Sequence, residues 1–162
     1  MRFEELSPEE RMVLEELKEY GFDPWVALHN MVLLAAHNGR REIFTLNNKA
    51  LDVLLRMKHE SYFAGLYLGE IKGDKFHLGL EGGTLLSKYA SKTITVDDKV
   101  EQLVLYGRDV FINSILKYGH PLKQDDKCLI LNKNGDFLAI GRLRGNIIEN
   151  ILDKGWYLRK GE

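Results

Sequence analysis

The sequence has one cysteine, Cys128, and no long run of apolar residues. A single cysteine cannot form an internal disulfide, and it also excludes a Cys-rich zinc site. No stretch approaches the roughly 18 apolar residues of a membrane span, and the acidic start MRFEE is unlike a signal peptide, which is basic and then apolar. We therefore expect a soluble cytoplasmic protein that does not associate with membranes.

The chain also has little net charge, −1 at neutral pH, but this charge is distributed unevenly. Residues 1 to 23 carry eight acidic and three basic side chains, so the remainder of the chain has a net charge of +4. This mild excess is far from that of a histone-like polycation. Any nucleic-acid site must therefore be a local cluster of basic residues, and binding to it must depend on salt.

The composition, 44% hydrophobic and 29% charged, is typical of a folded globular protein and not of a disordered chain. A chain of 162 residues can bury one core or two smaller ones, and length alone does not decide between them. The sequence shows no internal repeat and no low-complexity segment. The order of the expected helices and strands must therefore indicate the domain organisation.

The first clear element is a helix that begins at Ser7. Ser7 is expected to cap it, Pro8 takes the first helical position, and Glu10 completes a capping box. The helix should run to Tyr20 and end at Gly21, with a solvated acidic outer face. The residues expected to face inward are Met12, Val13, Leu14 and Leu17.

The rest of the first half is expected to mix helices and strands. Residues 24 to 36 are ambiguous, because Asp23-Pro24 could begin a second helix while residues 31 to 36 could form a buried strand. The other expected elements are a strand at 42–46, a helix at 47–58, a hairpin of 62–72 and 75–80 around Gly73-Asp74, and a short helix at 84–89 after Gly82-Gly83.

The second half of the sequence is richer in strands. We place a domain boundary near residue 94, which gives a first domain of residues 1–93 and a second of residues 94–162. The expected strands of the second domain are 93–96, 127–131, 137–142 and 156–159, with a turn at Asn134-Gly135.

A series of spaced motifs in the second half resembles a PUA domain, a small β pseudo-barrel named for pseudouridine synthases and archaeosine transglycosylases. The resemblance covers residues 94–162. Its motifs are Val96-Asp97, LYGRDV at 105–110, DDKCLI at 125–130, GDFLAIGR at 135–142 and DKGWYLR at 153–159.

The region before the PUA motifs is similar to the pre-PUA domain of the Nip-seven family of large-subunit ribosome-biogenesis factors, and the chain resembles the shorter, archaeal-type members. This similarity rests on KFHL at 75–78, LLSKYA at 85–90 and the run into LYG at 105–107. The resemblance implies an α+β protein: an N-terminal α/β domain with a mostly antiparallel sheet and flanking helices, followed by the pseudo-barrel.

The resemblance also implies a function. It implies an RNA-binding factor without catalytic activity or cofactor that acts in large-subunit pre-rRNA processing. The PUA domain would bind U-rich or A/U-rich single strands, and the N-terminal domain would contact protein partners. Nothing in the sequence demands more than a monomer, and a nucleolar location applies only if the source is a eukaryote.

Six residues near the C-terminus combine cations for phosphates with an aromatic ring on which a base can stack. Alternation along strands would bring the arginines and the tyrosine together into one basic patch. Charge spacing alone is equally compatible with an ordinary solvated edge, and the patch is thin. The candidate RNA-binding residues are Arg142, Arg144, Lys154, Tyr157, Arg159 and Lys160.

Other residues offer little chemistry. The five histidines lack metal-site spacing, Gly82-Gly83-Thr84 lacks the lysine of a P-loop, and Cys128 lies in an apolar strand where burial is expected. Gly107 is expected to serve a backbone turn, and Arg108 beside it could contact RNA or pair with Asp109. Two alternatives to the RNA-binding factor are an RNA-modifying enzyme, which would need a catalytic constellation not seen here, and a protein-interaction module with little RNA affinity.

Overall fold

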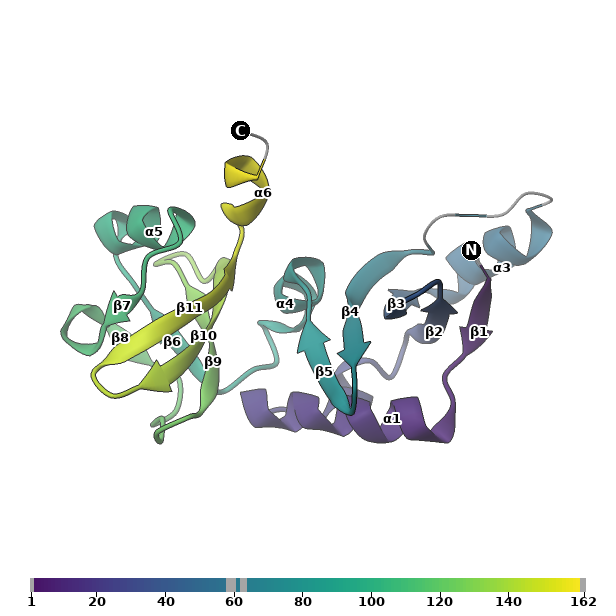
Figure 1. Cartoon of the computed structure of the whole chain (residues 1–162), viewed down its shortest axis with the longest axis horizontal. Helices are drawn as coiled ribbons and strands as arrows, with labels where there is room; N and C mark the ends of the chain where they lie inside the picture. Colours follow the sequence, from purple (N-terminus) through teal and green to yellow (C-terminus); the bar gives the residue numbers. More distant parts are fainter. Residues whose placement is uncertain (1, 58–60, 62–63, 161–162) are drawn as a thin grey trace. The chain divides into compact units, whose positions relative to one another are not determined.

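The computed structural model describes residues 2–57, 61 and 64–160, and the chain divides into two compact units. The first unit contains residues 1–18 and 23–82, and the second contains residues 19–22 and 83–162. Both units combine an antiparallel or mostly antiparallel sheet with short helices, which confirms the predicted α+β class (Figure 1). That residues 94–162 fold as an independent domain stays a prediction.

The first unit is built on a five-stranded antiparallel sheet with the order β1-β2-β3-β4-β5. The order along the sheet follows the order in the sequence, so successive strands are neighbours. Tight turns join β2 to β3 and β4 to β5, whereas longer segments that contain helices join β1 to β2 and β3 to β4. Gly73 (φ +63°) makes the turn between β4 and β5, as predicted. The strands are β1 (Phe3–Glu5), β2 (Val32–His37), β3 (Arg41–Leu46), β4 (Leu66–Lys72) and β5 (Lys75–Leu78).

The helices of the first unit begin at side-chain caps. The capping box of α1 (Pro8–Leu14) is confirmed, because Ser7 Oγ accepts from the Glu10 amide and the Glu10 carboxylate accepts from the Ser7 amide. Asp23 caps α2 (Pro24–Ala27) and Asn47 caps α3 (Asn48–Arg56) through a side-chain oxygen that accepts from the amides of Trp25 and Ala50, respectively, without a reciprocal bond. The ambiguous segment 24–36 thus contains both a helix and a strand, α2 followed by β2.

Two expectations about the first helix are wrong. It does not continue as an α-helix to Tyr20, because Glu15–Tyr20 forms the 3₁₀ helix η1 before Gly21 (φ +81°) ends it. Met12 does not face inward but is 74% exposed, whereas Glu10 is buried. Glu10 can be buried because His37 Nε2 lies 2.8 Å from its Oε1, so the carboxylate still has a hydrogen-bonding partner where water does not reach it.

The second unit contains a six-stranded sheet with the order β7-β11-β10-β9-β6-β8. β6 pairs with β9 in parallel and the other pairings are antiparallel, so the sheet curls into the predicted pseudo-barrel (Figure 1). Its strands are β6 (Thr93–Thr95), β7 (Val110–Phe111), β8 (Lys117–Tyr118), β9 (Lys127–Leu131), β10 (Phe137–Arg144) and β11 (Ile147–Asp153). Its helical segments are α4 (Leu80–Leu86), which begins in the first unit, α5 (Asp98–Leu105), η2 (Ile112–Ser114) and α6 (Trp156–Arg159).

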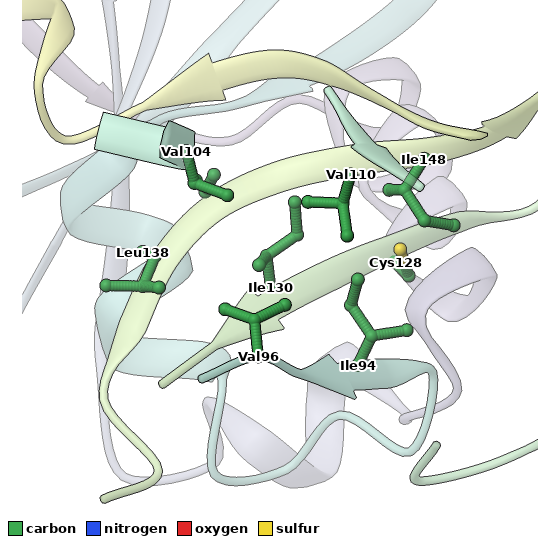
Figure 2. Packing of buried hydrophobic residues seen from close by; sticks show 9 residues of the cluster. Ile94, Val96, Val104, Val110, Cys128, Ile130, Leu138 and Ile148 are labelled. Carbon is green, nitrogen blue, oxygen red and sulfur yellow. The ribbon is translucent and has the colours of Figure 1, made fainter. Parts of the chain in front are cut away.

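The core of the second unit draws its side chains from α5 and five strands (Figure 2). Figure 2 shows Val104 of α5 and Ile148 of β11 over the same cluster that holds Cys128 of β9. Cys128 is fully buried and free, as the sequence predicted. The cluster consists of Ile94, Val96, Val104, Val110, Cys128, Ile130, Leu138, Ala139 and Ile148.

Several sequence predictions on the remaining elements need correction. The short helix expected after Gly82-Gly83 begins at Leu80 and includes both glycines. Gly83 has no room for a side chain, since a Cβ there would lie 2.4 Å from the Phe137 ring. Strand β11 and helix α5 were not predicted, and the expected last strand, 156–159, is the helix α6. The helix expected to Lys58 ends at Arg56, and the strand expected from Tyr62 begins at Leu66, after the described Ala64 and Gly65; Lys58 and Tyr62 themselves lie outside the described residues.

The helices in the described part of the chain are all short. None of them combines the length and the apolar character that crossing a membrane requires.

Candidate nucleic-acid interface

A groove of about 830 Å³ lies in the second unit between α5, the start of β10 and the segment that includes α6. Its apolar lining comes mainly from Leu105, Phe137, Leu138 and Leu158. Of the predicted RNA-binding residues, Lys154 and Arg159 line it. The groove is large enough for one nucleotide, since ligand pockets of drug-sized molecules span roughly 300–1,000 Å³.

Helix α5 forms one wall of the groove, and both of its ends are fixed. Asp97 Oδ1 accepts from the Val100 amide at 2.8 Å and caps the start. At the other end Gly107 (φ +83°) makes the predicted backbone turn. Asn150 Nδ2 of β11 donates to Val104 O at 3.0 Å and to Arg108 O at 3.2 Å, which ties the last turn of α5 to the sheet.

The opposite wall is held by an ion pair between Arg159 and Asp153. The guanidinium donates from Nη1 to Oδ1 at 3.0 Å and from Nη2 to Oδ2 at 2.9 Å, and Nη1 also donates to Leu105 O. Asp153 is buried, and its hydrogen bonds raise the pKa of Arg159. Of the five N–H groups of the guanidinium, two remain for a ligand. Arg159 is therefore first a structural residue of this wall.

Lys154, Tyr157 and Lys160 remain more available than Arg159. Lys154 is exposed, with its Nζ 5.5 Å from the centroid of the Phe137 ring, and the Lys160 Nζ lies 4.4 Å from the centroid of the Trp156 ring. The Tyr157 ring is 59% exposed and meets Trp156 edge to face, with centroids 5.1 Å apart. Phe137 is buried and Trp156 is half-buried, so the exposed Tyr157 ring is the one of the three that suits stacking of a base, while the two ammonium groups suit contact with phosphates.

The structure places Arg144 apart from these residues, and Arg142, two positions before it on β10, is half-buried. Lys154 lies beside Leu138, to whose carbonyl its amide donates at 3.0 Å, whereas Arg144 stands at the far end of β10. Arg144 lies six positions beyond Leu138 on β10, a span of roughly 20 Å. Arg144 is moreover paired with Asp125 Oδ1 at 3.1 Å and Glu149 Oε2 at 3.7 Å. The single basic patch expected from two strands is therefore wrong: residues 156–159 form the helix α6, and the register of β10 with β11 sets Ala139, not Arg144, opposite Asp153.

Sequence reasoning missed much of the groove because it missed α5. Tyr106, which follows α5 and is 72% exposed, and Leu158, which is 81% exposed, both line the groove. Asp97 followed by apolar residues at helical spacing, Val100 and Val104, was the available signal. The carboxylates of Glu101 and Asp136 also line the groove and were not considered.

No group of three His, Cys, Asp or Glu side chains within residues 2–57, 61 and 64–160 is arranged to hold a metal ion. Burial raises the pKa of the Cys128 thiol to about 12, with a further contribution from Asp126. A thiol with such a high pKa is a poor nucleophile. The lining of the groove itself offers charged side chains, hydrogen-bonding groups and apolar surface.

The curled sheet, the helix α5 against it and the motif series together define a PUA-domain protein with an additional N-terminal unit. A family model described as the UPF0113 PUA domain matches residues 92–162. The chain belongs to the UPF0113 family. It is 30% identical over 161 residues to a UPF0113 protein of Aeropyrum pernix, and this match covers 94% of this chain and 88% of the relative. It is also 27% identical over 161 residues to a UPF0113 protein of Archaeoglobus fulgidus, with 92% and 89% coverage.

Solved structures share the fold over almost the whole chain. A conserved PUA domain protein from Thermoplasma acidophilum superimposes with a TM-score of 0.64 at 18% identity, covering 99% of both chains. A PUA domain protein from Aeropyrum pernix, solved as a tartrate complex, gives a TM-score of 0.60 at 13% identity, covering 98% of this chain and 91% of that one. These similarities establish the two-unit fold.

Proposed function

We propose that this chain binds single-stranded RNA through the groove beside α5 and that it acts, without catalysing a reaction, as an assembly factor in large-subunit pre-rRNA processing. Membership of a PUA-domain family supports RNA binding, because PUA domains are RNA-binding modules. The role in ribosome biogenesis comes from the resemblance to the Nip-seven family, which also favours U-rich or A/U-rich strands.

The observation that carries the proposal is the arrangement around the groove. Tyr106 and Tyr157 are 72% and 59% exposed, and Lys154 and Lys160 add two cations on the same segment as Tyr157. An ordinary solvated edge would not account for exposed aromatic rings beside a groove. Stacking platforms combined with cations are what a sequence-tolerant single-strand site requires.

The N-terminal unit has a surface suited to protein partners. Helix α3 buries no residue completely, and it exposes Val53 (62%) and Leu55 (74%), while Met57 just after it is 49% exposed. Exposed apolar side chains grouped on one short helix are typical of interaction surfaces. We assign the protein contacts of the proposed assembly factor to this helix.

A second candidate function is a protein-interaction module that has kept the PUA fold and has little RNA affinity. Leu158, 81% exposed beside the groove, favours it, since an aliphatic side chain suits a protein surface better than a base. The two candidates differ in one measurable property, which is the affinity for RNA and its dependence on salt.

The test is a fluorescence-anisotropy titration of a labelled A/U-rich single strand with the full-length chain. We expect salt-sensitive binding, and we expect Lys154→Glu combined with Lys160→Glu to weaken it. If each lysine contacts one phosphate, the slope of log K against log salt should fall by about 1.4. Arg142→Glu with Arg144→Glu is the matched charge reversal, and it decides whether that separate end of β10 also contacts RNA. Absence of binding by the unmodified chain would favour the interaction module.

A further inference from the structure

Two tight turns lie side by side at one end of the sheet of the first unit. Strand β3 begins at Arg41, which pairs with Ile71 near the end of β4, so the turn before β3 and the turn after β4 are neighbours. The Arg41 guanidinium donates from Nη2 to the carbonyl oxygen of Gly73 and connects the two turns. Residues of both turns line a pocket of about 550 Å³, whose charged lining residues are Arg40, Arg41, Glu70 and Lys72.

This pocket is basic, although the first unit as a whole is acidic. Residues 1–18 and 23–82 carry ten basic and thirteen acidic side chains, a net charge of −3. The one carboxylate in the lining, that of Glu70, already pairs with Lys72, whose Nζ lies 2.6 Å from Oε1. The positive charges of Arg40 and Arg41 are therefore not balanced by a carboxylate of the lining.

Two further acidic residues lie near the pocket. Glu10 contacts the lining residue His37, but its carboxylate also accepts from the Ser7 amide and is buried. Asp74 follows Gly73 in the second turn and, within the described residues, forms no ion pair with either arginine. Neither acidic residue therefore occupies the two guanidinium groups.

The two arginines keep most of their hydrogen-bond donors available. Arg40 is exposed, and its side chain forms no hydrogen bond or ion pair within residues 2–57, 61 and 64–160. Arg41 uses one of its five guanidinium N–H groups on Gly73. A Cβ at Gly39 or at Gly73 would meet nothing within 4 Å, so the space beside both turns is open. A ligand with several oxygen atoms can approach both guanidinium groups there.

We propose that this pocket binds a phosphate group of the RNA backbone. Guanidinium groups bind phosphate oxygens through paired hydrogen bonds as well as through charge. Among the described residues that line the pocket, none is Phe, Tyr or Trp, so the site suits the backbone of a strand better than its bases. The inference rests on the proposed RNA binding, and it adds a contact made by the first unit to those made by the groove of the second.

The expected contribution can be measured from the salt dependence of binding. Each phosphate contact of a single strand adds about 0.7 to the slope of log K against log salt, which corresponds to about fourfold in affinity at about 0.15 M salt. The test is an anisotropy titration of a labelled A/U-rich single strand with the full-length chain at several salt concentrations. We expect Arg40→Gln combined with Arg41→Gln to lower the slope by about 0.7 and the affinity about fourfold.

Single variants of Arg40 keep the test decisive if the double variant is destabilised, since Arg41 also connects the two turns. Arg40→Gln breaks no hydrogen bond or ion pair of the described residues, so it should weaken binding without shifting the midpoint of urea denaturation. Arg40→Lys keeps the charge and loses the paired guanidinium donors, so it should retain the salt slope and lose less affinity than Arg40→Gln.

The matched control is Lys49→Gln combined with Arg56→Gln, which removes two exposed positive charges from α3 in the same unit. We expect this control to leave the salt slope unchanged. A decrease as large as that of the pocket variants would show that only the net charge of the unit matters, and it would overturn the phosphate site.

The remaining outcomes separate this inference from the function on which it rests. If Lys154→Glu with Lys160→Glu weakens RNA binding while the pocket variants bind like the unmodified chain, the phosphate site is overturned and the proposed function stands. Failure of the unmodified chain to bind RNA overturns both.

Discussion

Arg159 donates two parallel hydrogen bonds to Asp153, from Nη1 to Oδ1 at 3.0 Å and from Nη2 to Oδ2 at 2.9 Å. The same guanidinium reaches Leu105 O, so one side chain connects the end of β11, helix α6 and the end of α5. Gly155 lies where these meet, and a Cβ there would lie 1.8 Å from Leu105 O. The wall of the groove therefore depends on contacts between residues about fifty positions apart in the sequence.

We expect Asp153→Asn to lower the free energy of unfolding by roughly 2 kcal/mol. Loss of one partner of a fully buried ion pair costs about 3–5 kcal/mol, and the smaller figure allows for the exposure of Arg159. Urea denaturation measures the change. The control is Glu149→Gln, whose pair with Arg144 is about half exposed on both sides, at 51% and 49%. This pair should contribute below about 1 kcal/mol. Equal effects of the two substitutions would show that the Asp153 pair does not hold the wall.

The pair of Glu10 and His37 predicts a pH dependence of stability. Burial alone raises the pKa of Glu10, but the hydrogen bonds from Ser7 and His37 together outweigh it, so the pKa lies below its usual value of 4.5. A carboxyl group whose pKa is lower in the folded state stabilises the protein above its unfolded pKa, and this contribution is lost as the pH falls through the folded value. Stability should thus decrease progressively below about pH 4.5.

Urea denaturation at a series of pH values between about 6 and 3 measures this contribution. Glu10→Gln keeps an acceptor for the Ser7 amide and cannot titrate, so the difference between it and the unmodified chain should shrink as the pH falls. Glu9→Gln, at an exposed position on the same helix, is the control. A pH-independent difference between Glu10→Gln and the unmodified chain would contradict the assignment.

The contrast between the two ends of the chain shows what a sequence can predict. The capping box of Ser7 and Glu10 involves neighbours in the sequence, so residue types alone identify it. Trp156–Arg159 has aromatic residues that favour a strand, yet it folds as a helix because Gly155 approaches Leu105 and Arg159 meets Asp153. Local propensity gives no information on such contacts, and for the same reason the burial of Glu10 against His37 could not be foreseen.

In the candidate site, too, residue types could be predicted from the sequence but long-range contacts could not. Lys154, Tyr157 and Lys160 could be chosen from charge, aromaticity and family resemblance. Their separation from Arg144 could not, because it depends on the register in which β10 pairs with β11, where Arg144 faces Ile147 and Ala139 faces Asp153. The hydrogen bond from Asn132 to Glu101 likewise depends on how the turn after β9 and helix α5 are placed in three dimensions.

Cys128 should not react with thiol reagents in the folded protein. It is fully buried and its pKa is raised to about 12, so at pH 8 very little thiolate is present. A disulfide exchange reagent such as DTNB should label the chain stoichiometrically in urea and only very slowly without it. Slow native labelling at a rate that follows unfolding is expected. Rapid native labelling would show that the core of the second unit opens locally.

Stacking on the exposed tyrosines should contribute a large share of the proposed RNA affinity. Loss of one base–aromatic contact costs roughly 1–3 kcal/mol, so Tyr106→Ala and Tyr157→Ala should each weaken binding about tenfold or more. Tyr106→Phe and Tyr157→Phe keep the ring and should retain most of the affinity. Tyr118→Ala is the matched control, because Tyr118 is 43% exposed on β8, whereas Tyr106 lines the groove and Tyr157 directly precedes its lining residues Leu158 and Arg159. Equal losses for all three alanine variants would indicate nonspecific binding, whereas losses confined to Tyr106 and Tyr157 would support an RNA site beside α5.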